Sequence, residues 1–260
     1  MNRQIFFSAV ILLGVFSACQ SNKEEGQKEK VEKVQTIDNE TEFENRIAAI
    51  ENNPELIPVR SLSYNNNAGS TAEAIGYLDK DQKEVKIEEK FSYAETGNYG
   101  TNTFYVENGT QFASKEVYYD NTGAKPLFIE RISFYEKGKV IFTKERKADV
   151  EEDLINTTFQ VIPAKALSVD RAMQIINQQG PFETTFQGFA EGGGMKYLLV
   201  GENSAEGYAS SLAIQYQEGD IVKLMKNEKK MIGTPLIVNH EVMTDNTGLT
   251  FQVLITVKIK

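Results

Sequence analysis

Apolar and polar residues alternate with a period of two along the region from residue 59 to about residue 147. Phe104 and Val106 form one alternate apolar pair, and Ile132 and Phe134 form another. The runs are separated by turn-forming clusters whose glycines are at positions 97, 109, 123 and 138. This pattern predicts an antiparallel meander of hairpins, in which glycine supplies the positive φ that each turn needs.

The segment from Thr41 to Asn52 has helical spacing instead. Phe43, Ile47 and Ile50 fall on one face of a helix, and Pro54 follows the pattern and ends it. We therefore expect a helix that covers the meander with a single apolar stripe.

Two further helices are predicted downstream. One begins at Ser168 and ends at Gln178, inside a connection of residues 148–194, and Gly180-Pro181 stops it. The other covers Asp220–Met231, with apolar residues on one side and lysines on the other. Between them, Glu191-Gly192-Gly193-Gly194 is the strongest break in the chain and marks either a wide hairpin or a hinge.

The C-terminal part is again β. Its strand-like runs are Phe182–Phe189, Tyr197–Val200, Tyr208–Tyr216, Leu236–Met243 and Leu249–Ile259. The last four surround the short helix, which predicts a small barrel of the OB-like kind.

The predicted fold class is mainly β (α+β): an antiparallel hairpin meander with a covering N-terminal helix, followed by a small OB-like β-barrel part that contains a short helix. The predicted domain organisation is a signal peptide (1–18), a lipid-anchored flexible tether (19–40), a helix plus β-meander domain (41–147), a connection with the helix 168–178 (148–194) and a small barrel-like domain (195–260).

The first residues have the composition of an export signal. Arg3 precedes an apolar run from Ile5 to Phe16, and small residues precede Cys19. The run is shorter than the roughly 20 apolar residues that a membrane span needs. We expect Met1–Ala18 to be removed by cleavage after Ala18.

Residues 16–19, Phe-Ser-Ala-Cys, resemble the lipobox of bacterial lipoproteins, with Phe16 where the family usually has leucine. The resemblance implies that the thiol of Cys19 carries a diacylglycerol and that its new amine is acylated, with palmitate as the expected acyl group. Lipid attached at both the thiol and the amine agrees with stable anchoring, because one acyl chain alone binds a membrane only marginally. The alternative is a plain secreted protein with a chance cysteine near the cleavage site.

The tether from Gln20 to Asn39 is too polar to order itself by burial. Its segment Ser21–Glu25 is similar to the acidic surface-export signals of Bacteroidetes lipoproteins. This similarity implies an outer-membrane lipoprotein, and it leaves both the cell surface and the periplasmic face open.

Charge and composition narrow the partners. The formal net charge of the chain is −9, and it becomes −10 when Arg3 leaves with the signal peptide. An acidic body repels nucleic acid, so we expect no nucleic-acid partner. The expected partners are the membrane, through the N-terminal lipid anchor, and an envelope protein or an extracellular ligand. The chain has one cysteine and one histidine, so it has no disulfide framework and no histidine-rich metal site.

The motifs that suggest chemistry are weak. The triglycine lacks the following helix and the Lys-Ser/Thr pair of a phosphate loop. His240 has no nucleophile or metal ligand at a recognisable spacing, and the acidic cluster Asp149–Asp153 lacks the glycine and alternation of a calcium loop. Asp120–Gly123 and Asp245–Gly248 share the sequence Asp-Asn-Thr-Gly and are explained as turns. We expect no cofactor, no metal and no catalytic residue.

Strand tyrosines are candidate binding residues. The lack of tryptophan argues against a sugar-stacking cleft. Tyrosines can take the place of tryptophan as a stacking platform, but packing in the core and between strands is the more ordinary role of such side chains. The tyrosines concerned are Tyr93, Tyr99, Tyr105, Tyr118 and Tyr119.

The function predicted from these observations is a membrane-anchored, non-enzymatic binding module of the cell envelope. One alternative is a periplasmic carrier or chaperone of a hydrophobic ligand, in which the meander curves into a half-barrel closed by the helix 41–52. The other is a hydrolase with a carboxylate pair, whose spacing would be spatial and not sequential.

Overall fold

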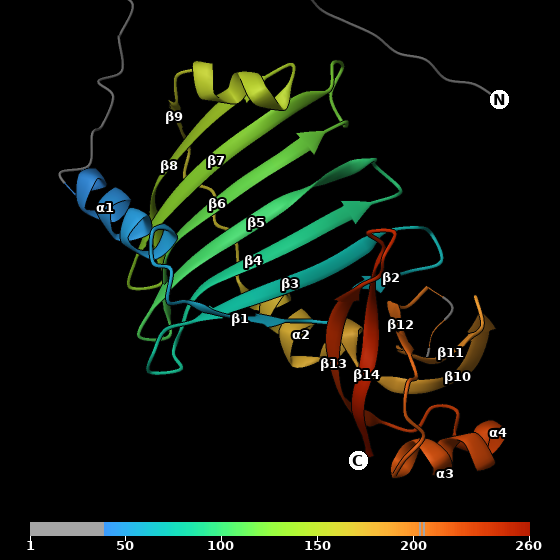
Figure 1. The fold of residues 1–260 in the computed structure, drawn as a ribbon. Helices are drawn as coiled ribbons and strands as arrows, with labels where there is room; N and C mark the ends of the chain where they lie inside the picture. Colours follow the sequence, from blue (N-terminus) through green and yellow to red (C-terminus); the bar gives the residue numbers. More distant parts are fainter. Residues whose placement is uncertain (1–38, 203, 205) are drawn as a thin grey trace, which may run out of the picture. The chain divides into compact units, whose positions relative to one another are not determined.

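A computed structural model describes residues 39–202, 204 and 206–260 (Figure 1). These residues belong to one compact unit of the chain. The predicted signal peptide, the lipidation site Cys19 and the tether up to residue 38 lie outside the described residues.

The described chain is mainly β, as the alternation predicts, and it contains one mixed sheet of 14 strands that is not closed. The strands are β1 (Ile57–Arg60), β2 (Tyr64–Asn65), β3 (Thr71–Leu78), β4 (Glu84–Tyr93), β5 (Asn98–Glu107), β6 (Thr110–Asp120), β7 (Leu127–Glu136), β8 (Lys139–Ala148), β9 (Gln160–Ile162), β10 (Thr185–Gly192), β11 (Met195–Gly201), β12 (Ala209–Ala213), β13 (Leu236–Thr244) and β14 (Thr250–Ile259). The helices are α1 (Glu40–Glu51), α2 (Asp170–Asn177), α3 (Asp220–Lys226), α4 (Glu228–Met231) and the 3₁₀ segments η1 (Glu151–Asn156) and η2 (Gly180–Phe182).

Consecutive strands from β3 to β9 pair antiparallel, each with the next one along the chain. Figure 1 shows β3 to β8 side by side in sequence order. Because side chains alternate across a strand, this register determines which residues of different strands share a face.

Glycine forms three of the four predicted turns with a positive φ. The φ values are 73° at Gly97, 75° at Gly109 and 74° at Gly138. Asn108 and Lys137 precede two of these glycines and also have positive φ values, 51° and 50°. Two successive residues with positive φ are typical of the type I′ turns that join twisted strands.

The fourth turn is formed differently, and the prediction for Gly123 is wrong, because its φ is not in the left-handed region. The Asp120 carboxylate organises this loop instead. Its Oδ1 accepts hydrogen bonds from the backbone N–H and the hydroxyl of Thr122, at 3.0 and 2.6 Å. Asp245 accepts the same two hydrogen bonds from Thr247, at 2.8 and 2.6 Å. The shared tetrapeptide is therefore a turn in both places, as expected.

The sheet of the meander packs helices on both of its faces. Phe43 of α1 packs on Phe134 and Phe112, with ring centroids 5.3 and 6.5 Å apart. Ala172 of α2 packs with Ile87 and Phe104, which belong to the opposite face. The helix predicted to cover the meander is thus present, and it begins at Glu40.

Two downstream helices differ in detail from the prediction. The second helix, α2, ends at Asn177 because Gln178 has a φ of 53°, so the stop lies before Gly180-Pro181. The predicted helix Asp220–Met231 is two helices, since Asn227 has a non-helical backbone between α3 and α4.

The triglycine segment is a tight hairpin turn. Gly192 pairs with Met195, and Gly193 and Gly194 between them have φ values of 59° and 77°. Of the two interpretations, the structure therefore favours a hairpin, and it is not wide. The preceding strand begins at Thr185, later than predicted.

The C-terminal strands belong to the same sheet as the meander. Ala209 of β12 pairs with Asn65 of β2, and Ala213 pairs in parallel with Val253 of β14. Their inner side chains form a large core with α2 and α3, which includes Phe186 and Leu224. The sheet is not closed, so the OB-like arrangement and the domain boundary near residue 195 stay predictions.

Candidate functional site

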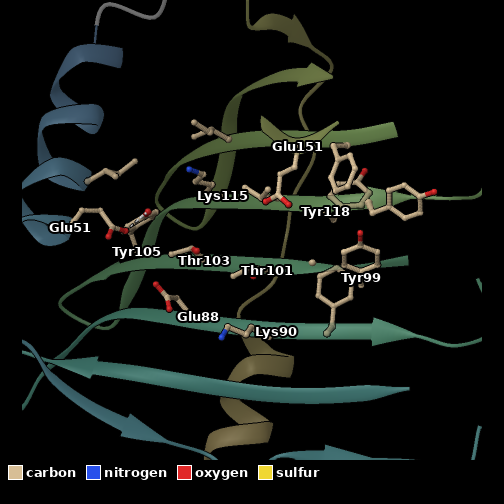
Figure 2. Close-up of a pocket in the computed structure, with 17 residues that line it drawn as sticks. Glu51, Glu88, Lys90, Tyr99, Thr101, Thr103, Tyr105, Lys115, Tyr118 and Glu151 are labelled. Carbon is tan, nitrogen blue, oxygen red and sulfur yellow. Dashed lines mark hydrogen bonds between the residues drawn. The ribbon is translucent and has the colours of Figure 1, made fainter. Parts of the chain in front are cut away.

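A cavity of about 760 Å³ lies on the face of the sheet that α1 covers in part (Figure 2). Its floor is formed by β4, β5, β6 and β7, and its rim includes Ile47 and Glu51 of α1 and Glu151 of η1. Pockets that hold small ligands have volumes of roughly 300–1,000 Å³. The size of this cavity is therefore that of a ligand site.

One end of the floor is aromatic because the strand register aligns three rings. Tyr99 pairs with Tyr119, and Tyr119 pairs with Phe128 on the next strand. The ring centroids of Tyr99 and Tyr119 are 5.3 Å apart with 26° between the planes, and Phe128 lies 5.1 Å from Tyr119. We call Tyr99, Tyr119 and Phe128 the aromatic row. Tyr99 is 47% exposed, so the row is accessible from the cavity.

The middle of the floor presents hydroxyl groups. Thr101 and Thr103 are two residues apart on β5 and therefore face the same side, and Figure 2 shows both on this strand, between Glu88 and Lys115 of the neighbouring strands. In the part of the chain that the structure describes, neither hydroxyl has a hydrogen-bond partner. Both line the cavity, Thr101 half-buried and Thr103 with only 8% of its surface exposed, so a ligand can reach their donors and acceptors only from the cavity.

The end nearest α1 is held by an ionic and hydrogen-bonded cluster. Lys86 Nζ lies 3.0 Å from Glu51 of α1 and 3.0 Å from Glu88. Tyr105 donates a hydrogen bond of 2.7 Å to the other oxygen of Glu51. Burial raises the pKa of the Tyr105 hydroxyl, and the neighbouring Glu51 raises it further, so Tyr105 stays a neutral donor. This cluster joins α1 to the cavity floor.

The same cluster keeps its lysine charged. Burial alone would lower the pKa of Lys86, but its hydrogen bonds to Glu88 and Glu51 outweigh this effect and raise that pKa. Glu51 and Glu88 therefore each form an ion pair with the charged Lys86 side chain.

A second ionic cluster borders the floor on the side of β7. Lys115 Nζ lies 2.9 Å from Glu130, and Arg146 forms an ion pair with the same carboxylate. The cavity lining contains charged residues of both signs: the acids Glu51, Glu88 and Glu151 and the lysines Lys90 and Lys115. The cavity has no strong preference for an anion or a cation on this basis.

The candidates from the sequence are distributed differently. Four of the five candidate tyrosines border the cavity: Tyr99, Tyr105, Tyr118 and Tyr119. Tyr93 does not, and its ring packs on that of Phe91, with the centroids 5.1 Å apart. Of the five tyrosines, Tyr105 is a buried structural residue and only 2% exposed. The two in the aromatic row are the ones placed for stacking.

His240 is remote from this cavity. It lies on β13, and its Nε2 is 3.1 Å from the backbone carbonyl oxygen of Ser61, to which it donates when protonated at that nitrogen. Burial lowers the pKa of its imidazole, and the hydrogen bond to Ser61 only partly offsets this. The contact is that of a packed strand residue.

The acidic cluster does not form a cation site among the described residues, where no group of three potential metal-ligating side chains occurs. Asp149 pairs with Lys125 at 2.5 Å, and Glu151 reaches the rim of the cavity. Asp149 and Glu151 therefore lie in different surroundings, one in an ion pair and the other at the cavity rim.

Sequence reasoning missed Thr101, Thr103 and Lys115 as site residues. The alternation on β5 places both threonines on one face, but only the register brings Lys115 opposite Thr103. Gly100 was missed too: a Cβ there would collide with the backbone of β6, so glycine allows the close approach of these strands under the cavity.

Comparison of the chain with protein-family models, curated proteins and solved structures found no match. Among the described residues, no helix has both the length and the apolar character that crossing a membrane requires.

Proposed function

We propose that the protein is a lipid-anchored, non-enzymatic binding module of the cell envelope, which binds a small polar or amphipathic ligand in the cavity above β4–β7. The observation that carries this proposal is the pair of hydroxyls at Thr101 and Thr103, without partners in the described chain, beside an accessible aromatic row. Convergent polar groups beside aromatic surface are typical of ligand sites.

The carrier of a hydrophobic ligand fits this cavity less well. The position of α1 over the sheet supports it, since a helix covers part of the floor. An acyl chain laid along the floor would, however, cover the Thr103 hydroxyl, Glu88 and Lys115 without replacing their contacts with water. Burying polar groups without hydrogen bonds costs free energy, so an apolar ligand is disfavoured.

A carboxylate-dependent hydrolase is also less well supported. The candidates are Glu51 of the rim and Glu88 of the floor, and Lys86 lies 3.0 Å from each of them. A glycosidase pair needs one carboxyl as a general acid and the other facing a water or the sugar. Two carboxylates that share one ammonium have the arrangement of a structural ion cluster.

The site is tested by removing its hydroxyls. The double substitution Thr101→Val with Thr103→Val keeps the shape of the floor and removes two hydrogen-bonding groups. We expect compounds that raise the Tm of the wild-type protein in a screen of small polar molecules to bind the double variant at least about tenfold more weakly, since leaving polar ligand groups unpaired costs ~1–3 kcal/mol.

The matched control for this test is Thr244→Val, which alters an exposed strand threonine away from the cavity. If ligands bind the double variant as tightly as the wild type, the cavity is not the binding site.

The anchor is tested separately, in a Bacteroidetes host grown with labelled palmitate. We expect the wild type to take up the label and to fractionate with the outer membrane, and Cys19→Ala to lose both properties, because the proposed acyl chains attach there. Protease treatment of intact cells then distinguishes the cell surface from the periplasmic face. A Cys19→Ala variant that fractionates like the wild type would contradict the anchor.

A further inference from the structure

We infer that the ligand of this cavity is a neutral oligosaccharide, with one sugar ring packed on the aromatic row and its hydroxyls hydrogen-bonded along β5. This inference rests on the proposed binding site and names its ligand class. It follows from four properties of the cavity: its aromatic end, its hydroxyl groups, the ion pairs of its charged residues and its length.

The aromatic end is suited to the C–H face of a sugar ring. A sugar ring is puckered, with apolar C–H groups on its faces and hydroxyl groups at its rim. Tyr119 and Phe128 have centroids 5.1 Å apart with 53° between their planes, and Tyr99 stacks on Tyr119. The phenol groups of Tyr99 and Tyr119 add polar atoms at the edge of this apolar surface, and tyrosine is common at sites with one apolar and one wet side for this reason.

The middle of the floor is suited to the hydroxyl rim of the same ligand. Thr101 and Thr103 each offer one donor and two acceptor positions, and Lys115 lies opposite Thr103 on the neighbouring strand. Glu88 lies opposite Thr103 on the other side. Hydroxyl groups of a sugar can both donate and accept, so they match a mixture of hydroxyl, ammonium and carboxylate groups.

The charges of the lining favour a neutral ligand. Lys115 is paired with Glu130, and Glu88 is paired with Lys86. Lys90, the other lysine of the lining, is paired with Glu73, so an anion would have to displace a carboxylate that is already in place. A cation would find only Glu151, at the rim, without an ion pair among the described residues. A neutral ligand can accept hydrogen bonds from the ammonium groups without disturbing the pairs.

The length of the floor favours more than one sugar ring. The lining of β5 extends from Tyr99 to Tyr105, a distance of about 20 Å at roughly 3.3 Å per residue. The cavity runs from the aromatic row to Glu51 of α1 and is open to solvent, so a chain can lie along it (Figure 2).

The test uses the lipidated full chain in a detergent without a sugar headgroup, with binding measured by isothermal titration calorimetry. The probes are three neutral trisaccharides (maltotriose, cellotriose and mannotriose), the charged trisaccharide trigalacturonate, and palmitate. We expect at least one neutral trisaccharide to bind with a Kd below about 1 mM. We expect trigalacturonate and palmitate to bind more weakly than that trisaccharide.

The decisive variants are at Tyr119. Tyr119→Leu keeps apolar surface and removes the flat ring, so we expect it to weaken trisaccharide binding about tenfold or more, the equivalent of one lost stacking contact. Tyr119→Phe keeps the ring, and we expect it to change affinity by less than about threefold. Tyr216→Leu is the control, because that tyrosine is 73% exposed and lies outside the cavity. Should Tyr119→Leu fail to fold, Tyr99→Leu replaces it at a more exposed position of the same row.

The outcomes separate this inference from the proposed function. If no neutral trisaccharide binds, while palmitate or trigalacturonate binds and loses affinity in the Thr101/Thr103 double variant, the oligosaccharide is overturned and the site stands. Equal trisaccharide affinity in Tyr119→Leu and the wild type overturns the stacking role and with it the inference. If no compound of any class is sensitive to the threonine pair, the proposed function falls as well.

Discussion

Replacing Phe134 with alanine is expected to lower the free energy of unfolding by about 3–5 kcal/mol, the usual cost of truncating a large aromatic residue in a packed core. Phe134 is fully buried, and its ring lies 5.3 Å from that of Phe43 and 6.0 Å from that of Phe142. The ring therefore joins β7, β8 and α1, and its removal leaves a cavity beneath the helix.

Urea denaturation followed by circular dichroism measures this change. The control is Ile141→Ala on β8, whose side chain is 38% exposed, and we expect it to cost less than about 1 kcal/mol. A shift in the midpoint without a change in slope would indicate a loss of stability alone. If the two variants unfold at the same urea concentration, α1 does not pack on the sheet as described.

The substitution Arg131→Met is expected to lower the free energy of unfolding by about 3–5 kcal/mol at pH 7, because it removes a buried guanidinium that pairs with the buried Glu145 and the partly buried Glu116. Arg131 is 5% exposed. Its guanidinium donates to Glu116 at 2.8 Å and to Tyr118 at 3.1 Å, and it forms two hydrogen bonds with Glu145. The control is Arg60→Met on the exposed strand β1, which we expect to change stability by less than about 0.5 kcal/mol.

The effect of Arg131→Met should depend on pH. Burial acts to raise the pKa of Glu145, but hydrogen bonds from Lys147 and Arg131 outweigh it and hold that pKa below its ordinary value. A depressed carboxyl pKa stabilises the folded state above the unfolded pKa of about 4.3, and this contribution is lost as the pH falls through the folded pKa.

In Arg131→Met, burial remains while part of the compensation is gone, so the carboxyl takes up a proton more readily. We therefore expect the difference between wild type and variant to become smaller from pH 7 to pH 4, as measured by urea titrations across that range. A difference that stays constant would mean that the ion cluster does not set the protonation of Glu145.

Local patterns in the sequence determine a large part of this fold. The period of two along β5 and β7 and the Asn-Gly and Lys-Gly turns at Gly109 and Gly138 specify hairpins without any knowledge of distant residues. Gly123 is instructive because the same residue type does not have the same role: the Asp120 side chain forms that turn. The residue types predict a turn at this position, but they do not predict whether a glycine backbone or a side-chain hydrogen bond stabilises it.

Contacts between distant segments explain what the sequence could not predict. The alternation places Thr101, Thr103 and Tyr119 on definite faces, yet their meeting in one cavity depends on the pairing of β5 with β6. A shift of one residue would move the side chains of one strand to the other face. The arrangement of β12 is of the same kind, since its pairing with both β2 and β14 has no local signal.

The order of strands in the sheet has a consequence for how the chain folds. Each pair from β3 to β8 closes through a short turn, so these contacts form early at little loop-closure cost. The contact of the Ser210 hydroxyl with the carbonyl oxygen of Ser63 instead joins residues 147 positions apart. We expect the meander to collapse first and β12 to dock last, which makes the joint between β2 and β12 the slow step of folding and the first place to open under stress.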